Sequence, residues 1–94
     1  MATRHKNLWV NLSNIDDVNY QVGIEMRKSK GKFGRFSSHH ELYAVLKEEL
    51  DEFWDSIKRD DTDPGELLQI IAVATSGLLQ ICDEVRAEKI GKAL

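Results

Sequence analysis

Apolar residues recur at helical spacing in three segments of the chain, and each segment is bounded by residues typical of helix ends. The first segment places four apolar residues on one helix face, at intervals of three or four positions: Ile15, Val18, Val22 and Met26. Ser13 is suited to the N-cap, and the acidic Asp16 and Asp17 suit the first turn of a helix. The pattern predicts an N-terminal lead (1–12) and then a first helix (13–30).

The second segment follows a basic loop, residues 31–37, that contains two glycines. Ser38 and Glu41 form the pattern of a capping box, in which serine and glutamate side chains satisfy backbone N–H groups at a helix start. An apolar stripe then runs at intervals of three or four residues: Leu42, Leu46, Leu50, Phe53 and Ile57. These features predict a second helix over residues 38–59.

The third segment has an equally clear start, because Asp63 can cap a helix, Pro64 suits its first position and Glu66 completes the box. From Leu67 to Cys82 the predicted helix, residues 63–90, is apolar on nearly every side. Two other helices cannot surround it in so short a chain. The sequence therefore predicts an all-α fold, in which a three-helix chain completes a four-helix-type bundle through dimerisation.

Gly77 lies inside this third segment, where glycine costs about 1 kcal/mol of helix propensity relative to alanine. A close crossing of two helices at Gly77 explains why such a residue is present. Cys82 has apolar neighbours and is the sole cysteine, so we expect a buried structural thiol and no intramolecular disulfide.

Chain length and charge limit the number of domains and the kinds of partner that the protein can bind. The 94 residues suffice for a single domain, 1–94. Residues 1–40 carry seven basic against three acidic residues (+4), whereas residues 41–66 carry three basic against ten acidic residues (−7). The acidic centre argues against duplex nucleic acid as a partner.

The N-terminus lacks a signal-peptide pattern, and the longest apolar run has sixteen residues with polar interruptions, where a span needs about twenty. We therefore expect no membrane partner and a cytoplasmic location.

Carboxylates crowd the stretch EELDEF, residues 48–53. At about 100° per residue, Glu49 and Glu52 fall beside the apolar stripe, whereas Glu48 and Asp51 turn toward solvent. A short connection makes the second and third helices antiparallel, which brings Glu66 to a similar level.

Gln69 follows Glu66 at i+3, so three carboxylates and an amide can converge as oxygen ligands for Mg²⁺ or Mn²⁺. Two other interpretations remain open, namely acidic helix flanks with no ion and a Gln69 amide that is buried and hydrogen-bonded to a neighbour.

The spacing Glu48-Glu49-x-x-Glu52, thirteen residues, then Glu66-x-x-Gln69 resembles the EExxE…ExxD signature of the MazG-like, all-α nucleotide pyrophosphohydrolases, especially small bacterial and phage members. The resemblance covers about residues 33–85. It implies Mg²⁺-dependent hydrolysis of a nucleoside triphosphate to monophosphate and pyrophosphate, by a homodimer or a dimer of dimers.

Carried over by position, the resemblance assigns metal ligation to Glu49, Glu52, Glu66 and Gln69, and catalytic roles to Glu48, Glu49 and Glu52. Residues that can meet the phosphates or the base of the nucleotide are Lys47, Lys32, Arg35 and Trp54.

The chain departs from the family pattern at its last motif position, where Gln69 stands in place of aspartate. A glutamine carbonyl can coordinate Mg²⁺ but brings no charge. This departure gives a second hypothesis, in which a catalytically degenerate MazG-like helical dimer binds a nucleotide or a protein.

Overall fold

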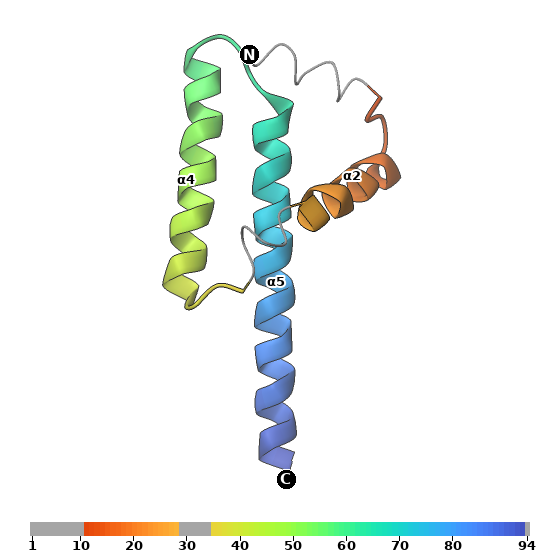
Figure 1. Ribbon diagram of the computed structural model, residues 1–94, viewed down its shortest axis with the longest axis vertical. Coiled ribbons are helices and arrows are strands. Elements are labelled where there is room, and N and C mark those ends of the chain that lie inside the picture. Colours follow the sequence, from red (N-terminus) through yellow and green to blue (C-terminus); the bar gives the residue numbers. More distant parts are fainter. Residues whose placement is uncertain (1–10, 29–34, 94) are drawn as a thin grey trace.

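The computed structural model describes residues 11–28 and 35–93 and is all-α in these ranges, with three helices (Figure 1). The helices are α2 (Ile15–Lys28), α4 (His39–Lys58) and α5 (Pro64–Ala93). The prediction of three helices is confirmed, with ends that differ by up to three residues from those expected. Lys32, most of the basic loop and most of the N-terminal lead lie outside the described residues.

Helices α4 and α5 form an antiparallel pair, as the short connection between them predicts (Figure 1). A Cβ atom built at Gly77 of α5 would lie 2.6 Å from both methyl carbons of Leu42 of α4. The two helices therefore approach closely at this level, which confirms the crossing expected at Gly77.

The turn between α4 and α5 is fixed by local hydrogen bonds. Asp60 takes a left-handed conformation, with φ of 55°, and its N–H donates to the carbonyl of Ile57. Asp61 N–H donates to the carbonyl of Ser56, and together these bonds form a Schellman motif that ends α4. The fully buried Ser56 hydroxyl also accepts from the N–H of Asp63, so this side chain ties the end of α4 to the start of α5.

The start of α2 differs by one residue from the predicted N-cap. Asn14, not Ser13, caps the helix, because its side-chain oxygen accepts from the N–H of Asp17. The Asp17 carboxylate in turn accepts from the N–H and hydroxyl of Ser13. Asn14 therefore caps the helix, and Ser13 contributes by binding the carboxylate of Asp17 in its first turn.

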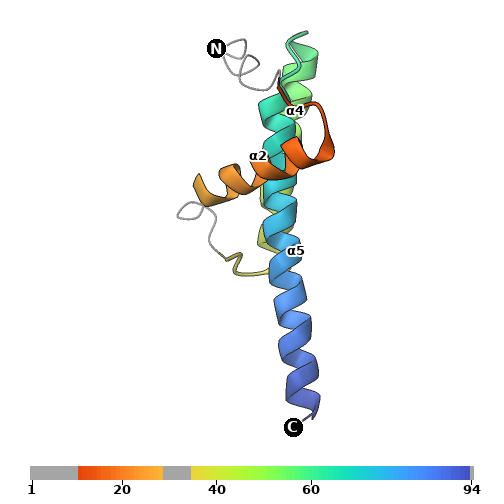
Figure 2. The ribbon, with the colours of Figure 1, turned by 90° about the vertical axis from the view of Figure 1, so that its right-hand side faces the viewer.

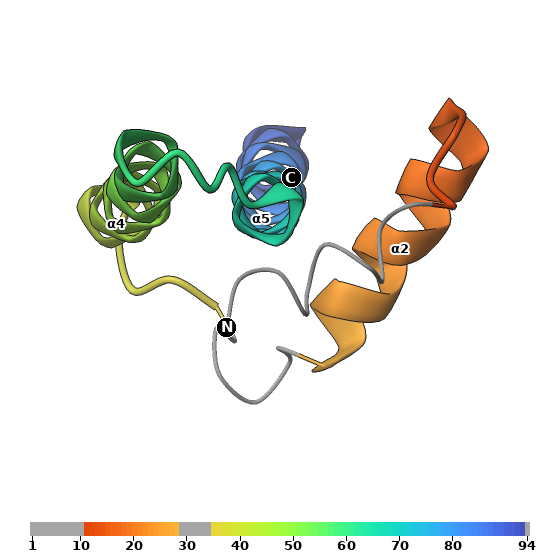
Figure 3. The same ribbon diagram turned by 90° about the horizontal axis from the view of Figure 1, so that it is seen from above.

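Helix α2 lies across α5 and packs against it, on a different side of α5 from α4 (Figures 2 and 3). The buried apolar residues come from α2, α5 and the segment before α4: Val22, Phe36, Leu68, Ala72 and Val73. Gln80 of α5 is also buried, and its amide accepts from the N–H of Phe36 and donates to the carbonyl of Phe36. This two-way bond fixes the segment that leads into α4.

Much of α5 remains exposed in the single chain, although the sequence predicts burial on all sides between Leu67 and Cys82. Leu78 and Leu79 expose 62% and 55% of their surface. The prediction of a buried Cys82 is wrong for the single chain, because this residue lies on an exposed part of α5. Burial of these residues requires a partner beyond α2 and α4.

Helix α5 is also longer than expected, since it continues to Ala93. By length and composition alone, Pro64–Gly91 could cross a membrane, contrary to the expectation from the shorter apolar run. The core helix of a soluble protein passes the same test when it is mostly buried, and 28% of this window is buried in the single chain. Contacts with α4 and α2, including the hydrogen bond between Gln69 and Glu25, cover part of α5.

Candidate functional site

Three carboxylates converge between α4 and α5. Glu49 and Glu52 lie on α4 and Glu66 lies in the first turn of α5, with one oxygen of each within 4.8 Å of the others. Glu49 and Glu66 are half-buried, whereas Glu52 is exposed. The structure therefore brings together the three acids that the motif spacing singled out, which come from segments on either side of a turn.

Local capping explains the position of Glu66. The carboxylate of Asp63 accepts from the N–H of Gly65, and the N–H of Glu66 donates to the backbone carbonyl of Asp63. These bonds fix the first turn of α5 against the end of α4. The N-terminus of a helix favours negative charge, which partly offsets the repulsion among the acids at this point.

The position of Glu66 between α4 and α5 changes its protonation. The pKa of Glu66 rises from 4.5 to about 7, chiefly because partial burial disfavours its charged form. A hydrogen bond to Glu52 and the negative charges of Glu52, Asp63 and Glu49 raise the pKa further. The raised pKa favours the protonated form of Glu66, at the place where a cation can substitute for the proton.

The cluster suits a hard divalent cation. Mg²⁺ binds carboxylate oxygens at about 2.0–2.1 Å, so two oxygens on one ion lie at most about 4 Å apart. The three observed oxygens lie within 4.8 Å of one another, somewhat beyond that limit. Oxygen-only donors match Mg²⁺ or Mn²⁺ and not zinc. Exposed carboxylates also gather without any ion, so the geometry fits a cation and leaves its presence to experiment.

Gln69 lies on the side of α5 that meets α2. Its amide nitrogen donates to the carboxylate of Glu25 over 2.9 Å, and Glu25 is 9% exposed. Lys28 lies 3.8 Å from the same carboxylate group and offsets part of its charge. The hydrogen bond expected for the Gln69 amide is confirmed, whereas Gln69 is half-buried and not fully buried. The carbonyl oxygen of Gln69 takes no part in this bond.

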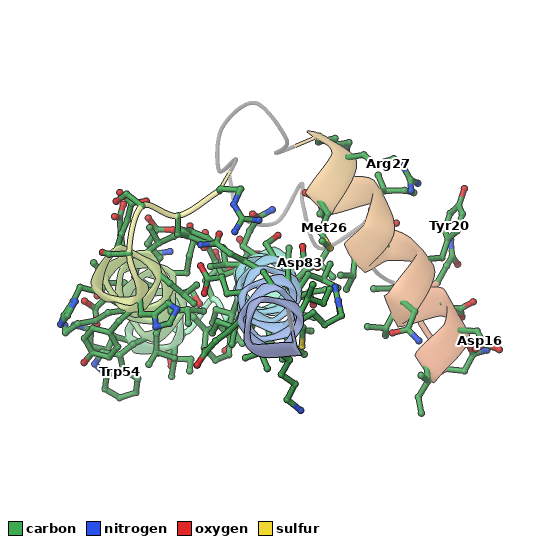
Figure 4. The ribbon with its side chains drawn as sticks, turned by 90° about the horizontal axis from the view of Figure 1, so that it is seen from below. Asp16, Tyr20, Met26, Arg27, Trp54 and Asp83 are labelled. Atoms are coloured by element: carbon green, nitrogen blue, oxygen red, sulfur yellow. The ribbon has the colours of Figure 1, made fainter. Side chains whose placement is uncertain are left out.

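Glu48 and Asp51 are exposed, as the helical geometry predicts, and Glu48 is not among the three converging acids. Lys47 forms an ion pair with Asp51 over 3.1 Å on the outer surface of α4. Trp54 is 54% exposed and points away from α2, with the ammonium of Lys58 5.9 Å from its ring centre (Figure 4). The structure therefore leaves Lys47, Glu48 and Trp54 outside the cluster.

Arg35 lies near the other end of the helix pair. Its guanidinium is 4.0 Å from Asp83 and 3.8 Å from Glu84, both on α5. At 1.5 Å per residue, Asp83 is about 25 Å along the helix from Glu66. The structure thus separates Arg35 from the acidic cluster, and Lys32 is outside the described residues.

Glu84 forms a second polar group that the sequence patterns do not reveal. A hydrogen bond from His39, 2.9 Å long, lowers the pKa of Glu84, and a bond from Gln80 acts in the same direction. His39 is itself exposed. The group joins the start of α4 to the middle of α5 and serves to hold the pair together.

Comparison with protein-family models, curated proteins and solved structures gives no match for this chain. The function is therefore inferred from the site itself. Three convergent carboxylates, with oxygens within 4.8 Å of one another, can bind a divalent cation and through it polyphosphate oxygens.

Proposed function

We propose that this protein is a Mg²⁺-dependent nucleoside triphosphate pyrophosphohydrolase of the MazG-like type, which releases nucleoside monophosphate and pyrophosphate. The observation that supports the proposal most directly is the convergence of Glu49, Glu52 and Glu66 within 4.8 Å. The motif spacing includes these three residues, and helical periodicity places them on the sides of the two helices that meet. Mn²⁺ is a suitable substitute because it takes the same oxygen ligands.

In this proposal Glu49, Glu52 and Glu66 hold the cation, and Gln69 can add its carbonyl oxygen. The bound cation supplies charge for the triphosphate oxygens and lowers the pKa of a coordinated water. Glu66 would lose its proton on cation binding, because a ligand carboxylate has to be ionised. Glu49 or Glu52 would orient the attacking water and accept its proton as the water oxygen bonds to the α-phosphorus and the bond to the bridging oxygen breaks, which releases pyrophosphate. Glu48 would contribute negative charge from the surface of α4.

Contacts to the nucleotide remain part of the proposal. Lys47 lies on the same helix as the cluster and is the basic residue nearest to it in the sequence among those proposed. Exchange of its exposed partner Asp51 for a phosphate costs little, since such surface pairs contribute about 0.3–0.5 kcal/mol. Lys32, Arg35 and Trp54 are further candidates, and Arg35 can contribute only in an assembly that brings it to another site.

We also propose a homodimer or a dimer of dimers in the cytoplasm, with no contribution from membrane or duplex nucleic acid. The support is the set of apolar side chains that α4 and α5 leave exposed, including Leu50, Trp54 and Leu78. Exposed apolar surface of this extent is uncommon on monomers and is typical of interfaces.

A second function is favoured by the hydrogen bond between Gln69 and Glu25. In the MazG-like pattern the position of Gln69 carries a ligand carboxylate, whereas here the amide supports the packing of α2 on α5. The alternative is therefore a catalytically degenerate helical dimer that binds a nucleotide or a protein partner.

Two substitutions at this position distinguish the enzyme from the degenerate relative. Gln69→Asp restores the motif acid, and Gln69→Glu is the matched control that adds the same charge on a longer side chain. If the natural protein is a competent enzyme, Gln69→Asp leaves pyrophosphate release unchanged or lowers it, because the new carboxylate repels Glu25. Activity that appears only in Gln69→Asp identifies the natural chain as the degenerate form.

A further inference from the structure

An apolar stripe runs along the exposed side of α5. Its six members are spaced by four, three, four, three and four residues: Leu67, Ile71, Ala74, Leu78, Ile81 and Val85. This alternation is the heptad spacing of helices that pair along one seam. Leu67, Leu78 and Val85 expose 45%, 62% and 44% of their surface in the single chain. We refer to these six residues as the α5 seam.

The seam lies opposite the side of α5 that meets α2 and flanks the side that meets α4. Gly77 marks the side of α5 that meets α4, and Gln69 marks the side that meets α2. At about 100° per residue, Leu78 lies about 100° from Gly77, and Ile71 lies about 160° from Gln69. Figure 3 shows α4 and α2 on different sides of α5, with a third side that neither helix covers.

Apolar residues of α4 extend the same surface. Tyr43, Leu50 and Trp54 expose 66%, 55% and 54% of their surface. Figure 4 shows that Trp54 projects on the side of the pair opposite to α2. The α5 seam and these α4 residues together form one broad apolar face, while the acidic cluster occupies the interface between α4 and α5.

We infer that the α5 seam pairs with the seam of a second copy of this chain, in antiparallel orientation and in one register. The spacing of the seam is symmetric about its centre, so a two-fold axis at the level of residue 76 matches every member. Ala74 of one copy then faces Leu78 of the other, Ile71 faces Ile81, and Leu67 faces Val85. The small Ala74 opposite the larger Leu78 lets the two helices interdigitate.

Charge favours antiparallel over parallel pairing. The turn at the N-terminal end of α5 is acidic and includes Asp60, Asp61 and Asp63, whereas residues 83–92 near its C-terminal end carry three basic and three acidic residues. In the antiparallel register Lys89 of one copy lies at the level of Asp63 of the other. Parallel pairing would instead place the two acidic turns side by side, which costs free energy through like-charge repulsion.

A lipid bilayer is a poorer occupant for this face. A helix that spans hydrocarbon has to present apolar side chains to lipid on its exposed sides over about 20 residues. Thr75 interrupts the partly exposed surface of α5 beside the seam, and the flanking α4 face carries Lys47 and Asp51 within one turn of Leu50. A second copy covers the seam and leaves these polar groups in water.

This inference deepens the homodimer in the proposed function, and it is tested without cation or nucleotide. Three variants are made in a Cys82→Ser background: Leu67→Cys, Val85→Cys and the double variant Leu67→Cys/Val85→Cys. Positions 67 and 85 are about 27 Å apart along α5, so no disulfide can form within a chain. After mild oxidation, covalent dimers are separated from monomers on a non-reducing gel.

The antiparallel register predicts a covalent dimer from the double variant and monomers from both single variants. Dimers from each single variant at comparable yield would establish parallel pairing and overturn the inference. Sedimentation of the unmodified protein provides the second measurement, for which we expect a dimer that Leu78→Asp weakens at least about tenfold in Kd. A monomer in sedimentation, or flotation of the protein with phosphatidylcholine vesicles, would likewise overturn it.

Discussion

Carboxylate oxygens of Glu52 on α4 and Glu66 on α5 lie within 4.8 Å of each other across the interface between the two helices. Burial and the neighbouring charges raise the pKa of Glu66 to about 7. When Glu49, Glu52 and Glu66 are all ionised, their negative charges repel one another and destabilise the interface between α4 and α5. A bound cation would remove this repulsion. This relationship links the stability of the fold to the chemistry proposed for it.

The stability of the cation-free protein should fall as pH rises from about 4.5 to about 7. Glu66 binds its proton more tightly in the folded chain than in the unfolded chain, where its pKa is near 4.5, so the folded state retains more protons in this window. The contribution of the Glu66 proton to the free energy of unfolding is complete below about pH 4.5 and is lost as the pH rises through about 7. Urea unfolding in EDTA at several pH values measures it, and Glu66→Gln should flatten this part of the profile. Equal slopes in both proteins would contradict the assignment.

A divalent cation should raise the melting temperature, and more so at pH 8 than at pH 6. At pH 6 the cation competes with the proton on Glu66, whereas at pH 8 the site is ionised before the cation binds. Saturation at a hundredfold excess over Kd stabilises the folded state by about 2.7 kcal/mol. Thermal shifts with Mg²⁺ and Mn²⁺ provide the measurement.

Two substitutions on α4 provide the matched comparison for this cation effect. Glu49→Gln removes one acid of the cluster, whereas Asp51→Asn removes one exposed acid two residues away that pairs with Lys47. The shift should be lost in Glu49→Gln and retained in Asp51→Asn. Loss in both variants would indicate a general effect of negative charge on α4.

The close approach of Gly77 to Leu42 predicts that the effect of alanine depends on the facing residue. Gly77→Ala adds about 1 kcal/mol of helix propensity but places a methyl group against the Leu42 side chain. In the Leu42→Ala background, where that conflict is absent, the substitution should stabilise the protein by about 1 kcal/mol. In the natural background it should be neutral or destabilising. A double-mutant cycle from chemical unfolding measures this coupling, and additive effects would contradict the crossing.

Asp60 offers a local test of the turn between α4 and α5. Its positive φ costs free energy for an aspartate and little for glycine, so Asp60→Gly should stabilise the fold by about 0.5–1 kcal/mol. Asp61→Gly is the matched control, because no positive φ is found at Asp61 and glycine there gains nothing. Thermal unfolding of both variants checks the difference. Equal changes would show that the gain comes from removal of negative charge and not from the backbone.

The helices could be predicted from the sequence because their signals are local. Ser38 caps α4 by accepting from the N–H of Glu41, as the capping box requires, although the glutamate side chain bonds Ser37 rather than Ser38. The cap of α2 was assigned to Ser13 and belongs to Asn14, because adjacent residues of similar capping propensity cannot be ranked by pattern alone. The three converging acids were also predictable, since helical periodicity and a short turn fix their relative positions.

Contacts between distant segments could not be predicted in the same way. The bonds of Gln69 to Glu25 and of Gln80 to Phe36 depend on how α2 and the segment before α4 settle on α5, and no periodicity encodes them. The expected burial of Cys82 was wrong because a run of apolar neighbours does not reveal which sides of a helix find a partner. The distance between Arg35 and the acidic cluster could not be predicted for the same reason. A basic loop in the sequence does not show which part of α5 its side chains contact.

The most direct test of the central proposal is pyrophosphate release from a panel of ribo- and deoxyribonucleoside triphosphates, with Mg²⁺ or Mn²⁺. Glu49→Ala removes one acid of the cluster, and Asp51→Ala is the matched substitution outside it. The account predicts release that depends on the cation, is lost in Glu49→Ala and persists in Asp51→Ala. Absence of release from folded natural protein, or equal release from Glu49→Ala, would contradict the proposed activity.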